Sequence, residues 1–554
     1  MSAGALDGPA EPAGTGSPGV AAGAVAAGRT PALRRLALFR LPTVVTGVLV
    51  LLWFAVGAGL RPLMLPDEGR YVGVAWEMLR SGDWLTPTLD GLPYFHKPPL
   101  FYWITAASMS VFGAHEWAAR AAPILGATLG TIALHGLARR WASERQARAT
   151  LVALLAQPMF FLGAQFANLD MLVAGCITAT IVLLADAALC VEHGRPARGV
   201  LAGAYVTAAL GVLAKGLIGF VLPALAIGVW LLARGRGRGL VRLWWWPGAA
   251  LFVVVVAPWF LAMQERFPGF LHYFFVVQHF QRFAGAGFNN VQPFWFYPAV
   301  LVLCCLPWTP WLLRGLRWPR KDLDGLGAIR LLMAVWIGVV VLFFSWPASK
   351  LVGYVLPAVP PLAFLLADAY VRAPATTGAR RLWVFGAVLA MVPNLAVVAW
   401  LATHPLQSSR GLAMALREHR RAGEPVVMLE QYPFDLPFYA GLRAPVLVVD
   451  DWSSVEIDRH DNWRKELADA ARLASPAARS VLLEPAELTS RLCAESSSWL
   501  LGAATLPARY PFLAAAEALR SDGGRTLWRV DARAPTELSA LGCSGTPSAG
   551  SAGR

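Results

Sequence analysis

The stretch LPDEGRYVGVAWEMLRSGDWLTPTLDGLPYFHKPPLFYW, residues 65–103, is a polar and aromatic segment between stretches that are apolar enough to lie in a bilayer. It contains two adjacent carboxylates, Asp67 and Glu68, and further on a cation, Lys97, that directly precedes two rigid prolines. Charges at the edge of a membrane span are costly, and they therefore mark candidate functional sites. We expect this segment to form one wall of a catalytic cavity in which Asp67 and Glu68 are catalytic.

The composition of the whole chain is that of a polytopic membrane protein. Hydrophobic residues make up 56% of the 554 residues and charged residues only 15%, against roughly one quarter charged residues in soluble domains. The formal net charge of +14 could point to nucleic acid, but basic residues cluster in short links between apolar runs, at 234–242, 314–321 and 372–381. Such links are typical of cytoplasmic loops. We therefore expect membrane lipids as partners and no nucleic acid.

The apolar runs predict an α-helical membrane domain of about 11–13 transmembrane helices in residues 41–403. Residues 1–40 are expected to be a disordered cytoplasmic tail, because residues 1–33 have almost no large apolar side chains. The run 44–65 reads as a signal anchor that leaves the N-terminus inside and residues 65–103 outside. Further apolar runs lie near residues 99–113, 119–137, 150–166, 172–190, 200–213, 217–233, 244–262, 294–313, 331–347, 351–371 and 382–403.

One pair of these runs conflicts with the positive-inside rule. If both 99–113 and 119–137 crossed the membrane, the basic link RRWASERQAR at 139–148 would lie outside. Either the run 99–113 is re-entrant or one crossing is miscounted.

After residue 403 the composition changes to that of a small soluble α/β domain. Residues 404–535 alternate β-like runs with helix-like segments of ordinary charge density. The β-like runs lie at 426–430, 445–450, 480–485 and 526–531. We expect this domain on the outer, periplasmic face and a flexible tail over residues 536–554. Cys493 and Cys543 lie in this part and could pair in an oxidising compartment.

Acids, bases and aromatic residues from several separate loops fall on the predicted outer side, in addition to Asp67, Glu68 and Lys97. The other members are Tyr94, His96, Asn168, Asp170, Lys215, His272, His279, Arg282, Lys350 and Tyr354. Each alone has a structural explanation: a lysine can reach the interface, an asparagine can bond a neighbouring helix, and a histidine can be packed. Gathered on one side of a membrane domain, however, they favour a functional site.

The chemistry of this set suits a lipid-linked sugar phosphate. Lys97, Arg282 and Lys350 could hold a phosphate at the membrane surface. Asp67 and Asp170 could act as a general base or stabilise positive charge on a sugar ring. The neighbouring aromatic residues can anchor the chain at the interface and stack on a sugar.

The sequence resembles the bacterial aminoarabinose transferases that modify lipid A, within the superfamily that includes dolichyl-phosphate-mannose protein mannosyltransferases. The matching pieces are DEGRYVGVAWEMLRSGDWLTPTLDGLPYFHKPPLFYW, FGAHEWAARAAP, the LD of FANLDML, the AKG of VLAKGLIG, VQHFQRFAG and SKLVGYVLPAVPPLA. They cover residues 65–370 in the order of the family, and the first piece is long enough to be specific. The C-terminal part matches in position and size only.

The resemblance implies a bundle of about a dozen transmembrane helices with juxtamembrane helices in the first outer loop. It implies transfer of a sugar from a polyprenyl phosphate carrier to an acceptor, lipid A or a protein, at the periplasmic face of the bacterial inner membrane. Asp67 and Asp170 match the essential acids of the family, and Lys97 and Arg282 its carrier-phosphate contacts. Lys215, Lys350 and Tyr354 match further cavity positions. His96 stands where the aminoarabinose enzymes commonly have Glu, which weakens the case for aminoarabinose as the sugar.

The expected mechanism is a single displacement with inversion at the anomeric carbon, in which Lys97 and Arg282 stabilise the departing phosphate. The sequence has no phosphate-binding glycine-rich loop and no acidic metal pair in a soluble domain. We therefore expect neither a nucleotide-sugar donor nor an obligatory cofactor or metal, although His96, His272 and His279 leave a metal site open.

Three alternatives remain. The protein could be a protein O-glycosyltransferase that uses the same class of donor. It could be a secondary transporter, which should show charges at mid-helix and a repeat between its two halves; we find no such repeat. A scaffolding membrane protein should carry few charges in its outer loops, contrary to the set described above.

Overall fold

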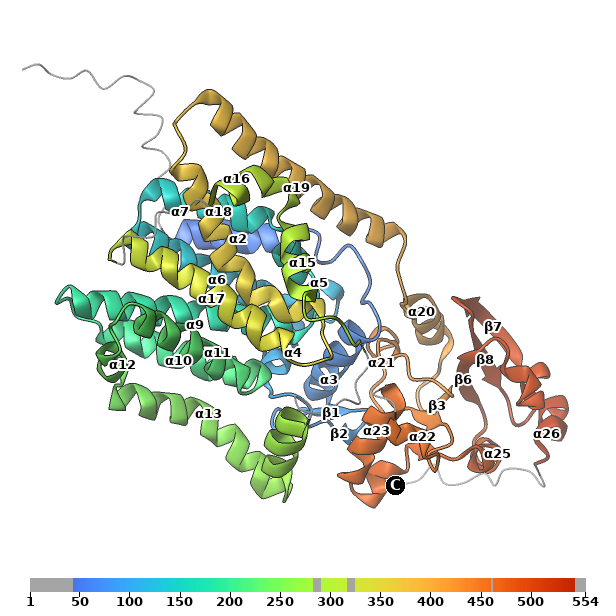
Figure 1. Ribbon diagram of the computed structural model, residues 1–554. Helices are drawn as coiled ribbons and strands as arrows, with labels where there is room; N and C mark the ends of the chain where they lie inside the picture. Colours follow the sequence, from blue (N-terminus) through green and yellow to red (C-terminus); the bar gives the residue numbers. More distant parts are fainter. Residues whose placement is uncertain (1–42, 282–289, 316–323, 460–461, 544–554) are drawn as a thin grey trace, which may run out of the picture. The chain divides into compact units, whose positions relative to one another are not determined.

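The computed structural model describes residues 43–281, 290–315, 324–459 and 462–543 (Figure 1). The predicted apolar runs form helices within these ranges. The helices up to residue 266 are α2 (Thr43–Ala55), α3 (Asp67–Ser81), α4 (Leu100–Phe112), α5 (Glu116–Ala119), α6 (Ala121–Trp141), α7 (Glu144–Ala156), α8 (Pro158–Ala164), α9 (Leu169–Glu192), α10 (Arg198–Lys215), α11 (Ile218–Ala233), α12 (Arg238–Leu243) and α13 (Trp246–Arg266). They are followed by η1 (His272–Gln281), α15 (Phe296–Cys304), η2 (Leu306–Trp308), α16 (Thr309–Gly315), α17 (Leu326–Ser345), η3 (Val352–Ala358), α18 (Val359–Val371) and α19 (Thr377–Thr403).

Length and composition qualify several of these helices as membrane spans. Within the described ranges, six helices are long and apolar enough to cross a membrane, and two bent pairs raise the number to eight if each pair is one span. Both bends coincide with prolines, since α8 begins at Pro158 and Pro307 lies between α15 and α16. Proline cannot donate the helical hydrogen bond and disrupts the preceding turn. The predicted class of α-helical polytopic membrane protein is confirmed.

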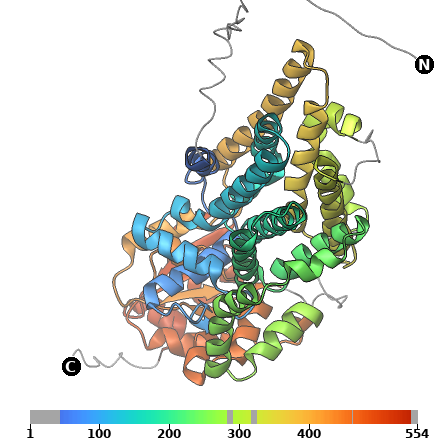
Figure 2. The same ribbon diagram turned by 90° about the vertical axis from the view of Figure 1, so that its left-hand side faces the viewer.

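Helix α9 is the most buried span of the bundle, with 89% of its apolar window inside the protein. It packs against α6, α10 and α11 (Figures 1 and 2). Glycines permit the closest of these contacts, because a Cβ atom on Gly126 of α6 would lie 2.5 Å from the Cα of Leu172 in α9. Small residues allow such close approach of helix backbones in membranes. This packing fixes the N-terminal end of α9, where Asp170 lies.

Helix α4 occupies the run 99–113 that conflicted with the positive-inside rule. It has 13 residues, as α2 does, so its length alone does not decide whether it crosses the membrane. Its main neighbours are α3, α5 and α6, and the Trp103 indole donates to the Trp84 carbonyl in the same loop. These contacts favour the re-entrant alternative, in which α4 belongs to the first loop.

The C-terminal part contains a six-stranded sheet in the order β5-β4-β3-β6-β8-β7. Strands β3 to β6 run parallel, and β8 pairs antiparallel with both β6 and β7. The strands are β3 (Val426–Leu429), β4 (Leu447–Val449), β5 (Leu482–Leu483), β6 (Ser498–Ala503), β7 (Glu517–Asp522) and β8 (Arg525–Val530). The accompanying helices are α20 (Arg410–His419), α21 (Leu436–Tyr439), α22 (Glu456–Arg459), α23 (Trp463–Arg472), α24 (Pro476–Arg479), α25 (Pro485–Cys493) and α26 (Pro535–Leu541).

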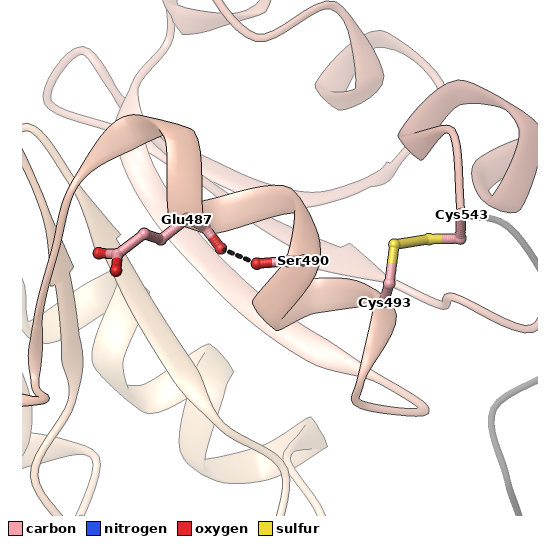
Figure 3. The surroundings of a disulfide bond; sticks show 4 residues. All are labelled: Glu487, Ser490, Cys493 and Cys543. Atoms are coloured by element: carbon pink, nitrogen blue, oxygen red, sulfur yellow. Dashed lines mark hydrogen bonds between the residues drawn. A yellow bond between two sulfur atoms is a disulfide. The ribbon is translucent and has the colours of Figure 1, made fainter.

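The sequence predicted four of these six strands and placed the C-terminal end of the domain too early, at residue 535. The edge strand β7 was missed because its charged sequence EALRSD has no apolar alternation. Residues 536–543 are not a flexible tail: they include most of α26, which a disulfide between Cys493 and Cys543 ties to the end of α25 (Figure 3). The two Cα atoms are 5.7 Å apart.

Candidate active site

Asp67 is the first residue of α3, directly after Pro66. A carboxylate in the first turn interacts favourably with the helix dipole, which helps to explain why the helix begins here. The Asp67 side chain is about one third exposed. Arg70, one turn further along α3, donates a hydrogen bond to its Oδ1 atom. Asp67 is thus held on one side and open to solvent on the other.

Glu68, the neighbouring carboxylate, points into the protein and has no exposed side-chain surface. It forms ion pairs with Arg61 and with Arg120, whose Nε lies 2.9 Å from Oε1, and it also accepts from the backbone N–H groups of Met64 and Ala167. Burial alone would raise the pKa of Glu68, but the two guanidinium groups outweigh it and lower the pKa to about 2. These contacts give Glu68 the surroundings of a structural anion, not those expected of a catalytic acid.

Asp170 is placed by the N-terminus of α9. The Asn168 side chain caps this helix by accepting from the Asp170 N–H at 2.9 Å, and its amide donates to the Asp170 carboxylate. Lys215, the last residue of α10, donates to the other carboxylate oxygen, and its Nζ lies 4.6 Å from the centre of the Tyr354 ring. The structure therefore brings together four residues of the predicted set: Asn168, Asp170, Lys215 and Tyr354.

Tyr71 connects this cluster electrostatically with Asp67. Burial raises the pKa of the Tyr71 phenol; Arg70 acts in the opposite direction, and the carboxylates of Asp67, Glu466 and Asp170 raise the pKa further. All three acids are therefore close enough to Tyr71 to act on its charge. The two acids predicted from separate loops, Asp67 and Asp170, converge on one region.

The loop before α4 holds a second group of predicted residues. The His96 ring is buried, with its centre 4.6 Å from that of Tyr94 and 6.2 Å from that of Tyr273 in η1. Lys97 is half-buried, and α4 begins after Pro98 and Pro99. The prolines restrict the backbone at Lys97 and so fix where its side chain leaves the chain.

The remaining predicted residues divide into those placed elsewhere and those outside the described part. Lys350 is buried, and its ammonium donates to the carbonyls of Gln292 and Pro347 at 2.9 and 2.6 Å. It thus holds two loops together. The His272 side chain is exposed. Arg282 and the side chain of His279 lie outside the described residues.

Two residues of the site were not predicted from the sequence: Arg70, which contacts Asp67, and Glu466, which contacts Arg70. Arg70 lies inside the quoted stretch, and its spacing of three residues from Asp67 on a helix was a usable signal. Glu466, which pairs with Arg70, comes from α23 in the C-terminal domain. No sequence pattern connects two residues that are 396 positions apart.

No metal site is evident among the residues with described side chains, where no group of three His, Cys, Asp or Glu residues is placed to hold an ion. The expectation that no metal is required stays untested.

The fold is a helical membrane bundle with acidic residues gathered at one end. Comparison with known proteins identifies the family to which it belongs. Residues 96–261 match the family described as dolichyl-phosphate-mannose-protein mannosyltransferase. Over 378 residues the chain is 31% identical to the undecaprenyl phosphate-α-4-amino-4-deoxy-L-arabinose arabinosyl transferase of Erwinia tasmaniensis, covering 66% of this chain and 67% of that protein. The chain belongs to this family of arabinosyl transferases.

Other comparisons extend this result. The Enterobacter sp. enzyme of the same name is 33% identical over 366 residues, and the match spans 63% of this chain and 64% of that relative. The crystal structure of ArnT from Cupriavidus metallidurans bound to undecaprenyl phosphate superposes with a TM-score of 0.75 and 25% identity, over 90% of this chain and 98% of that one. The fold thus agrees over nearly the whole length, whereas the sequence match spans between 55% and 67% of the length of the curated relatives.

Proposed function

We propose that this protein transfers a sugar from undecaprenyl phosphate to a lipid A phosphate at the periplasmic face of the inner membrane. The observation that carries the proposal is the cluster at the start of α9, at the end of an apolar bundle, where Asp170 pairs with Lys215 and the Lys215 ammonium lies 4.6 Å from the centre of the Tyr354 ring. The names of the relatives point to 4-amino-4-deoxy-L-arabinose as the sugar and undecaprenyl phosphate as the carrier. His96, at a position where Glu is common in these enzymes, keeps the identity of the sugar open.

In the proposed reaction the acceptor oxygen displaces the carrier phosphate from the anomeric carbon, with inversion. The departing phosphate needs charge stabilisation more than protonation, and fixed cations supply it without reorganisation. Lys97 has this role, together with Arg282 on sequence grounds. A lipid A phosphate is already anionic at neutral pH, so Asp67 and Asp170 stabilise the positive charge that develops on the sugar ring. Lys215 and Tyr354 keep Asp170 in place.

The proposed orientation follows from treating α4 as part of the first loop. The crossings are then α2, α6, the pair α7 and α8, α9, α10, α11, α13, the pair α15 and α16, α17, the segment 352–371 and α19. With the N-terminus inside, the basic links at 139–148, 234–242, 314–321 and 372–381 all fall on the cytoplasmic side, as the positive-inside rule requires. The candidate site and the C-terminal domain are then periplasmic.

Reporter fusions test this orientation. Alkaline phosphatase, which is active only in the periplasm, should be active when fused after Arg554 and inactive when fused after Gly235, in the basic link that follows α11. A cytoplasmic reporter should give the opposite pattern at both points. Activity of the cytoplasmic reporter after Arg554 would place the site on the wrong side for a periplasmic acceptor.

Removing the Lys97 charge should weaken carrier binding. Lys97→Ala is expected to raise the Kd for undecaprenyl phosphate about tenfold, because hydrogen bonds to charged groups contribute roughly 1.5–3 kcal/mol. Binding would be measured with purified protein in nanodiscs. Lys465→Ala is the matched control, since Lys465 lies on the outer helix α23 and pairs with Asp469. An unchanged Kd in Lys97→Ala would exclude Lys97 from the phosphate site and favour the transporter alternative.

Mass spectrometry of lipid A tests the function itself. Cells that contain the protein should carry a phosphate-linked sugar on lipid A, and cells without it should not. The match to the mannosyltransferase family keeps a protein acceptor as the second candidate. Unchanged lipid A together with loss of glycan from periplasmic proteins would select that candidate.

A further inference from the structure

Arg70 lies between two carboxylates that come from different parts of the chain. One of its amino groups donates to Asp67 on the same helix, and the other donates to Glu466 of α23 in the C-terminal domain. Its guanidinium also lies over two rings, 5.0 Å from the centre of Tyr71 and 5.7 Å from that of Phe434. A planar guanidinium suits such shared contacts because its donors have a fixed geometry.

Glu466 is held firmly enough to fix Arg70. Its side chain is only 9% exposed, and α23 is capped by Asn462, which accepts from the N–H groups of Arg464 and Lys465. Burial would lower the pKa of Arg70, but Glu466 raises it, with a smaller contribution from Asp67, and the net shift is upward. Arg70 therefore remains a cation that both acids share.

The C-terminal domain is tightly docked where Arg70 emerges from α3. A Cβ atom on Gly69 would lie 2.8 Å from the backbone nitrogen of Asp435, so only glycine permits this approach. Further along α3, Trp76 and Arg80 donate to the Leu442 carbonyl at 3.2 and 2.8 Å. The domain therefore presents Glu466 to Arg70 from a defined position.

We propose that Glu466 is a positioning residue for Asp67 and acts through Arg70, an inference that rests on the proposed function. The contact with Glu466 fixes the guanidinium of Arg70, and the guanidinium in turn fixes the Asp67 rotamer. The C-terminal domain thus completes the active site without contacting the substrate.

The test compares carboxylate variants of Glu466 in the full-length protein. Glu466→Gln should lower kcat about tenfold while the KM for the donor stays within about twofold, because positioning acts on the reacting geometry. Glu466→Asp keeps the charge and should restore at least a third of the wild-type kcat. The donor would be undecaprenyl phosphate-linked 4-amino-4-deoxy-L-arabinose, with lipid A as the acceptor.

Two controls separate positioning from loss of docking. Asp469→Asn removes a carboxylate one turn further along α23 that pairs with Arg472, and it should leave kcat unchanged. Arg80→Ala removes a docking contact that does not reach Asp67; it should lower the melting temperature and leave kcat at 25 °C unchanged. If the wild type is active and Glu466→Gln has an unchanged kcat, the inference is overturned while the proposed function stands. The same holds if Arg80→Ala, at the same loss of melting temperature as Glu466→Gln, loses as much kcat. A wild type without transfer would remove the proposed function and the positioning role with it.

Discussion

Asp67→Asn and Asp170→Asn are each expected to lower the rate of sugar transfer on the order of 100-fold, a rise in barrier of about 2.7 kcal/mol. Both substitutions are nearly isosteric and remove one negative charge from the place where positive charge develops in the proposed reaction. In Asp170→Asn the Lys215 ammonium also loses its anionic partner. Initial rates with purified protein would measure the effect.

Asp83→Asn is the matched control for these variants. Asp83 lies in the same loop as Asp67, is similarly exposed, and forms an ion pair with an arginine, Arg266 of α13, at 2.9 Å. It should transfer sugar at the wild-type rate. Normal membrane levels of all three variants would show that the loss is chemical. Wild-type activity in Asp67→Asn or Asp170→Asn would remove that residue from the mechanism.

Glu68→Gln is expected to reduce stability, by about 3–5 kcal/mol, because it leaves two buried guanidinium groups without an anion. The ion pairs with Arg61 and Arg120 are almost fully buried and join the start of α3 to the chain before α6. The melting temperature in detergent and the yield of inserted protein should both fall. Glu144→Gln is the control, since Glu144 also pairs with arginines but is exposed, and exposed pairs contribute only about 0–1 kcal/mol.

Glu68 also makes the stability of the protein depend on pH. The pKa of Glu68 is lowered from its ordinary value of 4.5 to about 2 in the folded protein. Its stabilising contribution is therefore complete above about pH 4.5 and is lost as the pH falls through about 2. Between these values the wild type should lose stability, and Glu68→Gln should lose less over the same interval. Normal stability together with lost transfer in Glu68→Gln would return Glu68 to the catalytic residues.

The charges of the site could be predicted, but their separate roles could not. Asp67 and Asp170 were found because charge is rare in an apolar chain. Glu68 gave the same signal as its neighbour, yet consecutive helical residues point about 100° apart, so Asp67 is partly open to solvent and Glu68 faces the interior. Without knowing which face of α3 packs against the protein, the sequence does not show which of the two carboxylates is buried. The arginine partners of Glu68 are 7 and 52 positions away, and no local pattern pairs them.

The fold could be predicted where apolar length decides it. Most apolar runs became a helix, the runs 150–166 and 294–313 became bent pairs of helices, and the strands β3, β4, β5 and β8 appeared where β-like sequence was found. The role of α4 required its neighbours in the structure, since its composition is that of a membrane span. Strand β6, with the sequence SWLLGA, is buried over nearly its whole length and has no alternation to distinguish it from a short helix.

The contact of Glu466 with Arg70 also has a consequence for the order of events during synthesis. The ribosome makes α3 and every apolar helix before it makes α23, so the bundle enters the membrane while one partner of Arg70 is still missing. If the C-terminal domain is periplasmic, Glu466 must cross the membrane before it can meet Arg70. The enzyme would then acquire its full activity only after export is finished, and a chain arrested after residue 403 would hold its spans in place but remain largely inactive.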